Sequence, residues 1–203
     1  MKLRHFHSIL TYPPKEPPVW APQVERWYQL DPYAYLLPEA FSQWEKEVES
    51  RPDVQFLASG GASNVTDQAF VMSRATSPTK FVHTLPNIRS SSLLAVMRWE
   101  GPVFSLHRDP HTLAAAFREA IRRWERDPLK ESWIWSVGDQ SESRSVDLWI
   151  LGGTKGANAP FRISPRIQDS RVYAEPEDMA ILRWFWDSKG DFDVSRQWTV
   201  RIE

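Results

Sequence analysis

The stretch GPVFSLHRDPHT, residues 101–112, has the pattern of a short strand, a sharp corner and the start of a helix. Val103–Leu106 is the apolar strand. Asp109 is a good N-cap, and Pro110 suits the first helical turn because no backbone N–H is needed there. A helix that begins directly after a strand aims its free N–H groups at the end of the sheet. The stretch therefore predicts an α/β fold with a polar corner beside a helix N-terminus.

The helix after Pro110 is the clearest one in the sequence. Its apolar residues lie on one face and its arginines lie on the other, which is typical of a helix packed on a sheet. The apolar residues are Leu113, Phe117, Ala120 or Ile121, and Trp124, and the arginines are Arg118, Arg122, Arg123 and Arg126.

Strand and helix patterns alternate along most of the chain. Strands are predicted over residues 3–10, 54–59, 103–106, 133–137, 146–151, 179–186 and 198–202, and helices over 38–50, 65–74 and 88–98. The alternation predicts a mixed, mainly parallel sheet of about five strands with helices on both faces. Residues 1–203 are expected to form a single domain. Its proline-rich segment, residues 12–32, is interpreted as a surface linker, with a proline-recognition motif as the alternative.

Composition excludes several classes of function. The net charge is −1 and the pI is about 6.5, so neither nucleic acid nor a membrane is an expected partner. The sequence has no cysteine, which excludes disulfides, thiolate metal sites and a cysteine nucleophile. It shows no signal peptide and no apolar run of roughly 20 residues, so a soluble, cytoplasmic protein is expected. Eleven tryptophans predict a core rich in large aromatics, with a partner surface as the alternative.

A second stretch, SPTKFVHTLPN at residues 77–87, precedes the Gly101-Pro102 strand with an apolar helix between them. This order resembles the N-terminal half of β-ketoacyl synthases, the condensing enzymes of fatty-acid and polyketide assembly. The resemblance covers residues 54–186 and implies one half of the thiolase-type fold. In that family the strand after Gly-Pro ends at the catalytic cysteine, which would fall at or beside Pro110.

The resemblance implies a protein without ketosynthase catalysis. The nucleophile is missing, and Asp109, Pro110 and His111 occupy a degenerate corner. The two catalytic histidines of the family's C-terminal half have no counterpart, because histidine occurs only at positions 5, 7, 83, 107 and 111. Cysteine-less relatives of the family are known as chain-length factors. The resemblance therefore implies a non-catalytic subunit that pairs with a Cys-bearing ketosynthase, an acyl carrier protein or a second copy of itself.

The same resemblance implies where such partners would bind. The strand and the 88–98 helix correspond to elements at the family's dimer contact, so the expected interface residues are Val103, Phe104, Ser105 and Leu106. A lone half would leave a helix layer uncovered, so the protein is not expected to be a free monomer. Arg118, Arg122, Arg123 and Arg126 are either a solvated helix face or a small basic patch for an acidic carrier protein.

Two other functions stay open from the sequence. An enzyme could use the remnant pocket, with His83, His107, Asp109 and His111 as acid–base groups. Alternatively, the chain is a stand-alone module that binds an acyl chain or a carrier protein. His107, Asp109 and His111 also form a possible metal-ligand set, but helix capping is the preferred interpretation, so neither a metal nor a cofactor is expected.

Overall fold

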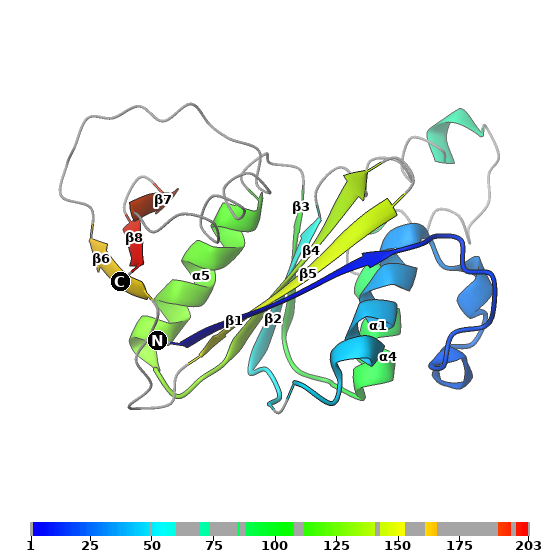
Figure 1. The fold of residues 1–203 in the computed structure, drawn as a ribbon, viewed down its shortest axis with the longest axis horizontal. Coiled ribbons are helices and arrows are strands. Elements are labelled where there is room, and N and C mark those ends of the chain that lie inside the picture. Colours follow the sequence, from blue (N-terminus) through cyan, green and yellow to red (C-terminus); the bar gives the residue numbers. More distant parts are fainter. Residues whose placement is uncertain are drawn as a thin grey trace.

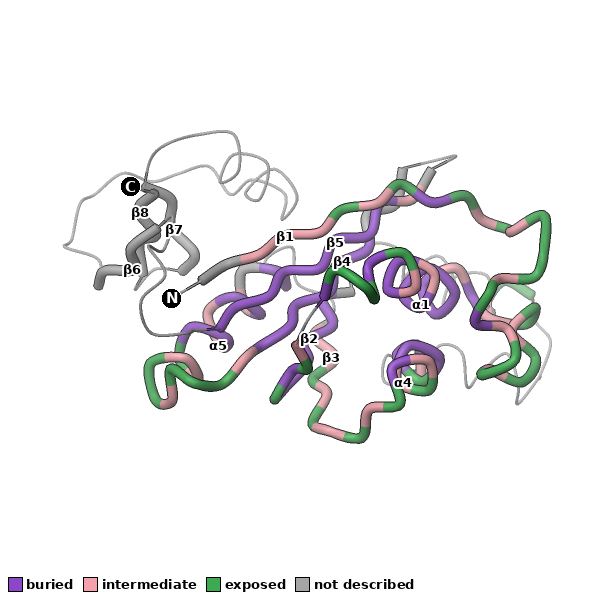
Figure 2. The backbone as a smooth tube through the Cα atoms, turned by 60° about the horizontal axis from the view of Figure 1, so that its bottom comes forward, coloured by how far each residue is buried: buried purple, intermediate pink, exposed green. Residues whose placement is uncertain are grey.

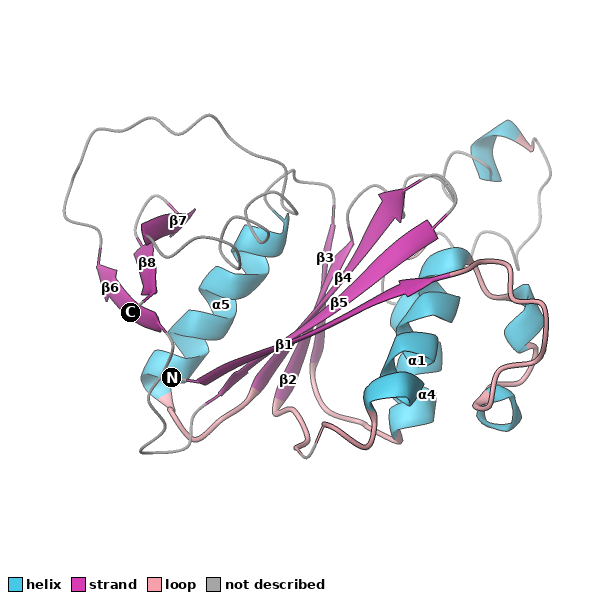
Figure 3. Cartoon of the chain, in the orientation of Figure 1, coloured by secondary structure: helices cyan, strands magenta, loops and turns pink. Residues whose placement is uncertain are grey.

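The structure, a computed structural model, describes residues 2–48, 50–59, 70–73, 85, 88–107, 112–140, 143–152, 161–165, 191–195 and 198–202. Within these residues the strands form one five-stranded and one three-stranded sheet (Figure 1). The larger sheet separates two helical layers, and the smaller sheet lies beyond one of them (Figure 3).

The described five-stranded sheet has the order β1-β5-β4-β2-β3. Strand β2 pairs in parallel with both β3 and β4, whereas β5 runs antiparallel to β4 and β1. Four strands therefore share one direction and β5 opposes them, which confirms the prediction of a mixed, mainly parallel sheet. The strands are β1 (Lys2–Leu10), β2 (Val54–Ser59), β3 (Val103–His107), β4 (Ser132–Gln140) and β5 (Ser143–Gly152).

Helices cover both faces of this sheet, as predicted. On one face α1 (Pro32–Trp44) packs beside α4 (Ser91–Met97), which follows the short 3-10 helix η3 (Ile88–Ser90). On the other face lies α5 (Thr112–Arg126) (Figure 3). The proline-rich segment contains two short 3-10 helices, η1 (Ala21–Gln23) and η2 (Trp27–Gln29).

Helix α1 corrects the predicted helix over residues 38–50, because it begins six residues earlier and ends at Trp44. The Asp31 carboxylate caps it by accepting a hydrogen bond from the Ala34 N–H at 2.8 Å. Pro38 consequently lies inside the helix, where proline cannot donate to the carbonyl four residues earlier, that of Ala34. The hydroxyl of Ser92 on α4 donates to that carbonyl instead.

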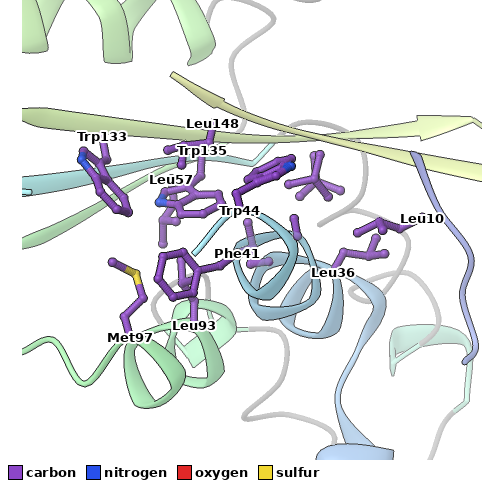
Figure 4. Packing of buried hydrophobic residues seen from close by; sticks show 14 of the residues in the cluster. Leu10, Leu36, Phe41, Trp44, Leu57, Leu93, Met97, Trp133, Trp135 and Leu148 are labelled. Atoms are coloured by element: carbon purple, nitrogen blue, oxygen red, sulfur yellow. The ribbon is translucent and has the colours of Figure 1, made fainter. Parts of the chain in front are cut away.

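Large aromatics fill the core between the sheet and α1, as the tryptophan content predicted. Trp135 is fully buried and stacks on Trp44 of α1, with ring centroids 6.3 Å apart. Phe41, Leu93 and Met97 close the cluster from the helical side (Figure 4). A second cluster lies under α5 and includes the buried ring of Phe56. Buried residues dominate β4 and β5, whereas β1 and β3 carry intermediate and exposed ones (Figure 2).

The described three-stranded sheet is antiparallel, in the order β6-β8-β7, and β7 lies against α5. Its strands are β6 (Phe161–Pro165), β7 (Asp191–Ser195) and β8 (Trp198–Ile202). Only β8 was predicted. The predicted strand over 179–186 lies outside the described residues, as does most of the predicted helix over 65–74. Within the part of the chain that the structure describes, no helix is long and apolar enough to cross a membrane.

Candidate interface at the edge of the sheet

The degenerate corner follows β3 in the sequence, and β3 ends level with β2, beside the third parallel strand β4, which continues to Gln140. Ser59 at the end of β2 pairs with His107 of β3 on one side and with Val137 of β4 on the other. Ligand sites of α/β sheets lie at such carboxyl ends. His83, Asp109, Pro110, His111 and the side chain of His107 lie outside the described residues, so the acid–base hypothesis stays a prediction.

Strand β3 forms an edge of the sheet, because among the described strands it pairs only with β2. The Gln55 N–H donates to the Pro102 carbonyl at 3.0 Å. This bond shows which residues of β3 direct their backbone groups toward β2 and which direct them away. Backbone groups alternate in direction along a strand. The N–H and C=O groups of Val103 and Ser105 therefore point away from β2, to the side on which no described strand pairs with β3.

The side chain of Phe104 is the main apolar group on this edge, with 42% of its surface exposed. Its ring stacks on the buried Phe56 ring at a centroid distance of 5.6 Å. The Arg123 guanidinium lies 5.0 Å from the centre of the Phe104 ring, and its Nε atom is 3.4 Å from Glu119. An arginine over a half-exposed aromatic ring forms a rigid, amphipathic surface.

The other predicted residues divide between the interior and the helix surface. Val103 packs on the core beneath α1, whereas Leu106 packs on the cluster under α5. Arg122 and Arg126 are exposed and Arg118 is half-buried. Arg123 is set apart from them because it lies over Phe104 rather than in open solvent. Of the four arginines predicted as a carrier-protein patch, three are therefore not engaged with Phe104, and the patch itself stays a prediction.

Two tyrosines of α1 have strongly shifted pKa values, although neither belongs to this edge. Burial raises the pKa of Tyr33 well above its usual value, and its hydroxyl donates to the Ala58 carbonyl at 3.3 Å. Burial also raises the pKa of Tyr35, helped by the nearby Glu39 carboxylate. Both phenols therefore stay protonated and serve as hydrogen-bond donors.

One polar cluster was missed by the sequence analysis. His5 Nε2 and His7 Nδ1 on β1 each lie 2.8 Å from the same carboxylate oxygen, Oδ1 of Asp147 on β5. The available signal was a His-x-His pattern within a predicted strand, because alternate residues of a strand share a face. The pairing that brings Asp147 opposite His7 depends on strand register, which the local sequence does not encode.

No protein-family model matches this sequence, and no curated protein matches it either. A chain in the solved structure of a ketosynthase (ApeO) in complex with its chain length factor (ApeC), from Xenorhabdus doucetiae, has a similar fold. The TM-score is 0.61 at 13% sequence identity, and the alignment covers 86% of this chain and 79% of that chain. The protein therefore has a ketosynthase-like fold of the thiolase type, as the resemblance of residues 54–186 implied.

Proposed function

We propose that this protein is a non-catalytic, chain-length-factor-like subunit of fatty-acid or polyketide-type biosynthesis. It pairs with a Cys-bearing ketosynthase through the outer edge of β3. The observation that carries the proposal is that β3 pairs only with β2 among the described strands, has no charged residue over 103–106 and exposes nearly half of Phe104. Two further observations support it. The sequence has no cysteine to hold an acyl thioester, and the similar fold belongs to a ketosynthase–chain length factor complex.

The two edges of the described sheet differ in their suitability for pairing. The opposite edge, β1, carries Arg4 within its length and Lys2 at its start. Charged residues on an edge strand disfavour addition of another strand. Residues 103–106 of β3 carry no charge and offer outward backbone groups at Val103 and Ser105. Strand β3 is therefore the edge that favours a partner.

The Phe104–Arg123 pair supplies the side-chain part of such an interface. Aromatic residues and arginine are enriched in the cores of protein interfaces. An aromatic side chain buries roughly 200 Å² in total, so covering the exposed 42% of Phe104 is worth about 2 kcal/mol at ~25 cal/mol per Å². Stacking on the buried Phe56 holds the Phe104 ring in place before the partner arrives.

The test is co-expression with a ketosynthase encoded in the neighbouring genes, followed by size-exclusion chromatography with light scattering. Ser105→Pro removes one outward N–H and should abolish the complex, whereas Ser105→Ala keeps that N–H and should retain it. Phe104→Ser should weaken the complex without removing any backbone donor. Thermal unfolding of each variant checks that the fold survives.

Three results would overturn the proposal or its assignment to β3. In one, the unmodified protein forms no complex with any such ketosynthase. In another, it forms only a complex with itself, and Ser105→Pro dissolves that complex, which would assign this edge to a homodimer. Retention of the heteromeric complex by both Ser105→Pro and Phe104→Ser would move the interface away from β3.

A further inference from the structure

The cluster of His5, His7 and Asp147 lies on the sheet face that α5 covers, because Trp149 of the same face belongs to the cluster under α5. His7 pairs directly with Asp147 across the β1–β5 ladder, and His5 pairs with Trp149. The His5 ring stacks on the Trp149 ring at a centroid distance of 3.7 Å. The strand register places both imidazoles beside the Asp147 carboxylate, and stacking on Trp149 orients the His5 ring.

Asp147 is a buried carboxylate whose two oxygens differ in their surroundings. Its side chain is only 3% exposed, and Oδ1 makes ion-pair contacts to the two histidines. Within the described part of the chain, Oδ2 is buried without a hydrogen-bond partner. A buried carboxylate oxygen without a partner is destabilising, and a bound ion would compensate its charge.

The geometry of the three donor atoms suits a small metal ion. One donor atom from each residue lies within 4.8 Å of the other two. Zinc bonds of 2.0–2.2 Å in a tetrahedral arrangement place donor atoms about 3.3 Å apart. Each nitrogen therefore needs to withdraw from Oδ1 by about half an ångström, and the distance between the two nitrogens, at most 4.8 Å, has to reach the same ~3.3 Å. His7, whose side chain is 43% exposed, leaves the cluster open to solvent on the β1 side.

We propose that His5, His7 and Asp147 form a binding site for a divalent first-row transition ion, with Zn²⁺ as the ion to test. Two imidazole nitrogens and one carboxylate oxygen are donors that Zn²⁺ accepts, whereas Mg²⁺ prefers oxygen alone. Binding requires His5 Nε2 and His7 Nδ1 as lone-pair donors, so each neutral ring carries its proton on the other nitrogen. The described residues supply three ligands, and water can take the fourth position.

The experiment is calorimetric titration of the full chain with ZnCl2, with MgCl2 as the comparison, together with thermal unfolding in each salt. The unmodified protein should bind one Zn²⁺ and gain thermal stability from it, with no gain from Mg²⁺. His7→Ala and Asp147→Asn should each weaken binding beyond the roughly 10–100-fold that outer-shell changes cost. Co²⁺ should give the visible absorption of a tetrahedral site in the unmodified protein but not in His7→Ala or Asp147→Asn.

Matched controls separate this site from surface binding. His83→Ala lowers the histidine count without changing a residue of β1, and Asp53→Asn removes a carboxylate that is not one of the three proposed ligands. Both should bind Zn²⁺ as the unmodified protein does. The proposal fails if the unmodified protein shows no Zn²⁺-dependent stability, or if His7→Ala binds as tightly as His83→Ala. His7→Ala is the decisive variant because the exposed side chain can be removed with little effect on packing.

Discussion

The hydrogen bond from Ser92 to the Ala34 carbonyl offers a quantitative test of how α4 is held on α1. Pro38 has no N–H to donate to this carbonyl. Ala34, which carries the carbonyl, is almost fully buried. Ser92→Ala would therefore remove the donor and leave a buried carbonyl without a partner. Such a group costs about 1–3 kcal/mol, whereas a typical hydrogen bond contributes only about 1 kcal/mol net.

A second substitution shows whether this reasoning is right. Pro38→Ala restores a backbone N–H that can donate to Ala34, so Ser92→Ala should cost little in that background. We expect a coupling free energy of about 1–2 kcal/mol between the two substitutions. Ser91→Ala is the matched control, because the Ser91 side chain is exposed and bonds only the Ile88 carbonyl within the same turn. It should change stability by less than about 0.5 kcal/mol.

The assay is urea unfolding followed by tryptophan fluorescence, with a shared m-value required across the four proteins of the cycle. Additive effects of Ser92→Ala and Pro38→Ala, within about 0.3 kcal/mol, would refute the proposed role of the Ala34 carbonyl. An equal loss from Ser91→Ala would also refute it, because that result would assign the effect to helix propensity.

Three further predictions concern buried polar groups. Asp31→Asn keeps a capping oxygen but removes the negative charge that lies 3.4 Å from Arg89 Nε. The free energy of unfolding in urea should therefore fall by about 3 kcal/mol, well above the ~1 kcal/mol that a helix cap contributes. Gln55→Leu deprives the Trp135 indole N–H of its 2.8 Å acceptor and should cost about 1–3 kcal/mol, but less in a Trp135→Phe background, where no indole donor is left unsatisfied. Burial raises the pKa of Tyr33 above its usual 10.0, so the folded state keeps a proton that the unfolded chain loses. Unfolding free energy should therefore fall as pH rises above 10, and Tyr33→Phe should remove up to about 1.4 kcal/mol per pH unit of that fall; an unchanged slope would exclude this phenol.

The spacing of apolar residues along the sequence was enough to predict those elements in which it fits only a strand or only a helix. Val54–Ser59 is a strand with the predicted bounds, and the amphipathic helix after Pro110 corresponds to α5. Their burial follows from their own sequence, since each presents apolar residues at the spacing of its element. The ketosynthase-like fold followed from the order of such elements together with the motifs at residues 77–87 and 101–110.

The prediction of α1 was wrong because two prolines compete as helix starts. Pro38 fits a first turn by local rules, but Asp31 and Pro32 provide an earlier start with a side-chain cap. The carbonyl that Pro38 cannot reach accepts instead from a hydroxyl more than fifty residues away in sequence. The His5–His7–Asp147 cluster was missed for the same physical reason. Its geometry exists only after β1 and β5 have paired in one register.

The two proposals concern opposite edges of the five-stranded sheet and can therefore be tested independently. The metal site depends on β1, and the partner site depends on β3, with three strands between them. His7→Ala should leave the affinity for a ketosynthase unchanged, and Ser105→Pro should leave Zn²⁺ affinity unchanged, since sites that share no side-chain partners usually act additively. Titration of both variants with Zn²⁺ and with the partner protein would measure this. If Zn²⁺ binding altered the partner affinity, the sheet would have to transmit the change across β5, β4 and β2, and the two edges would form one coupled system.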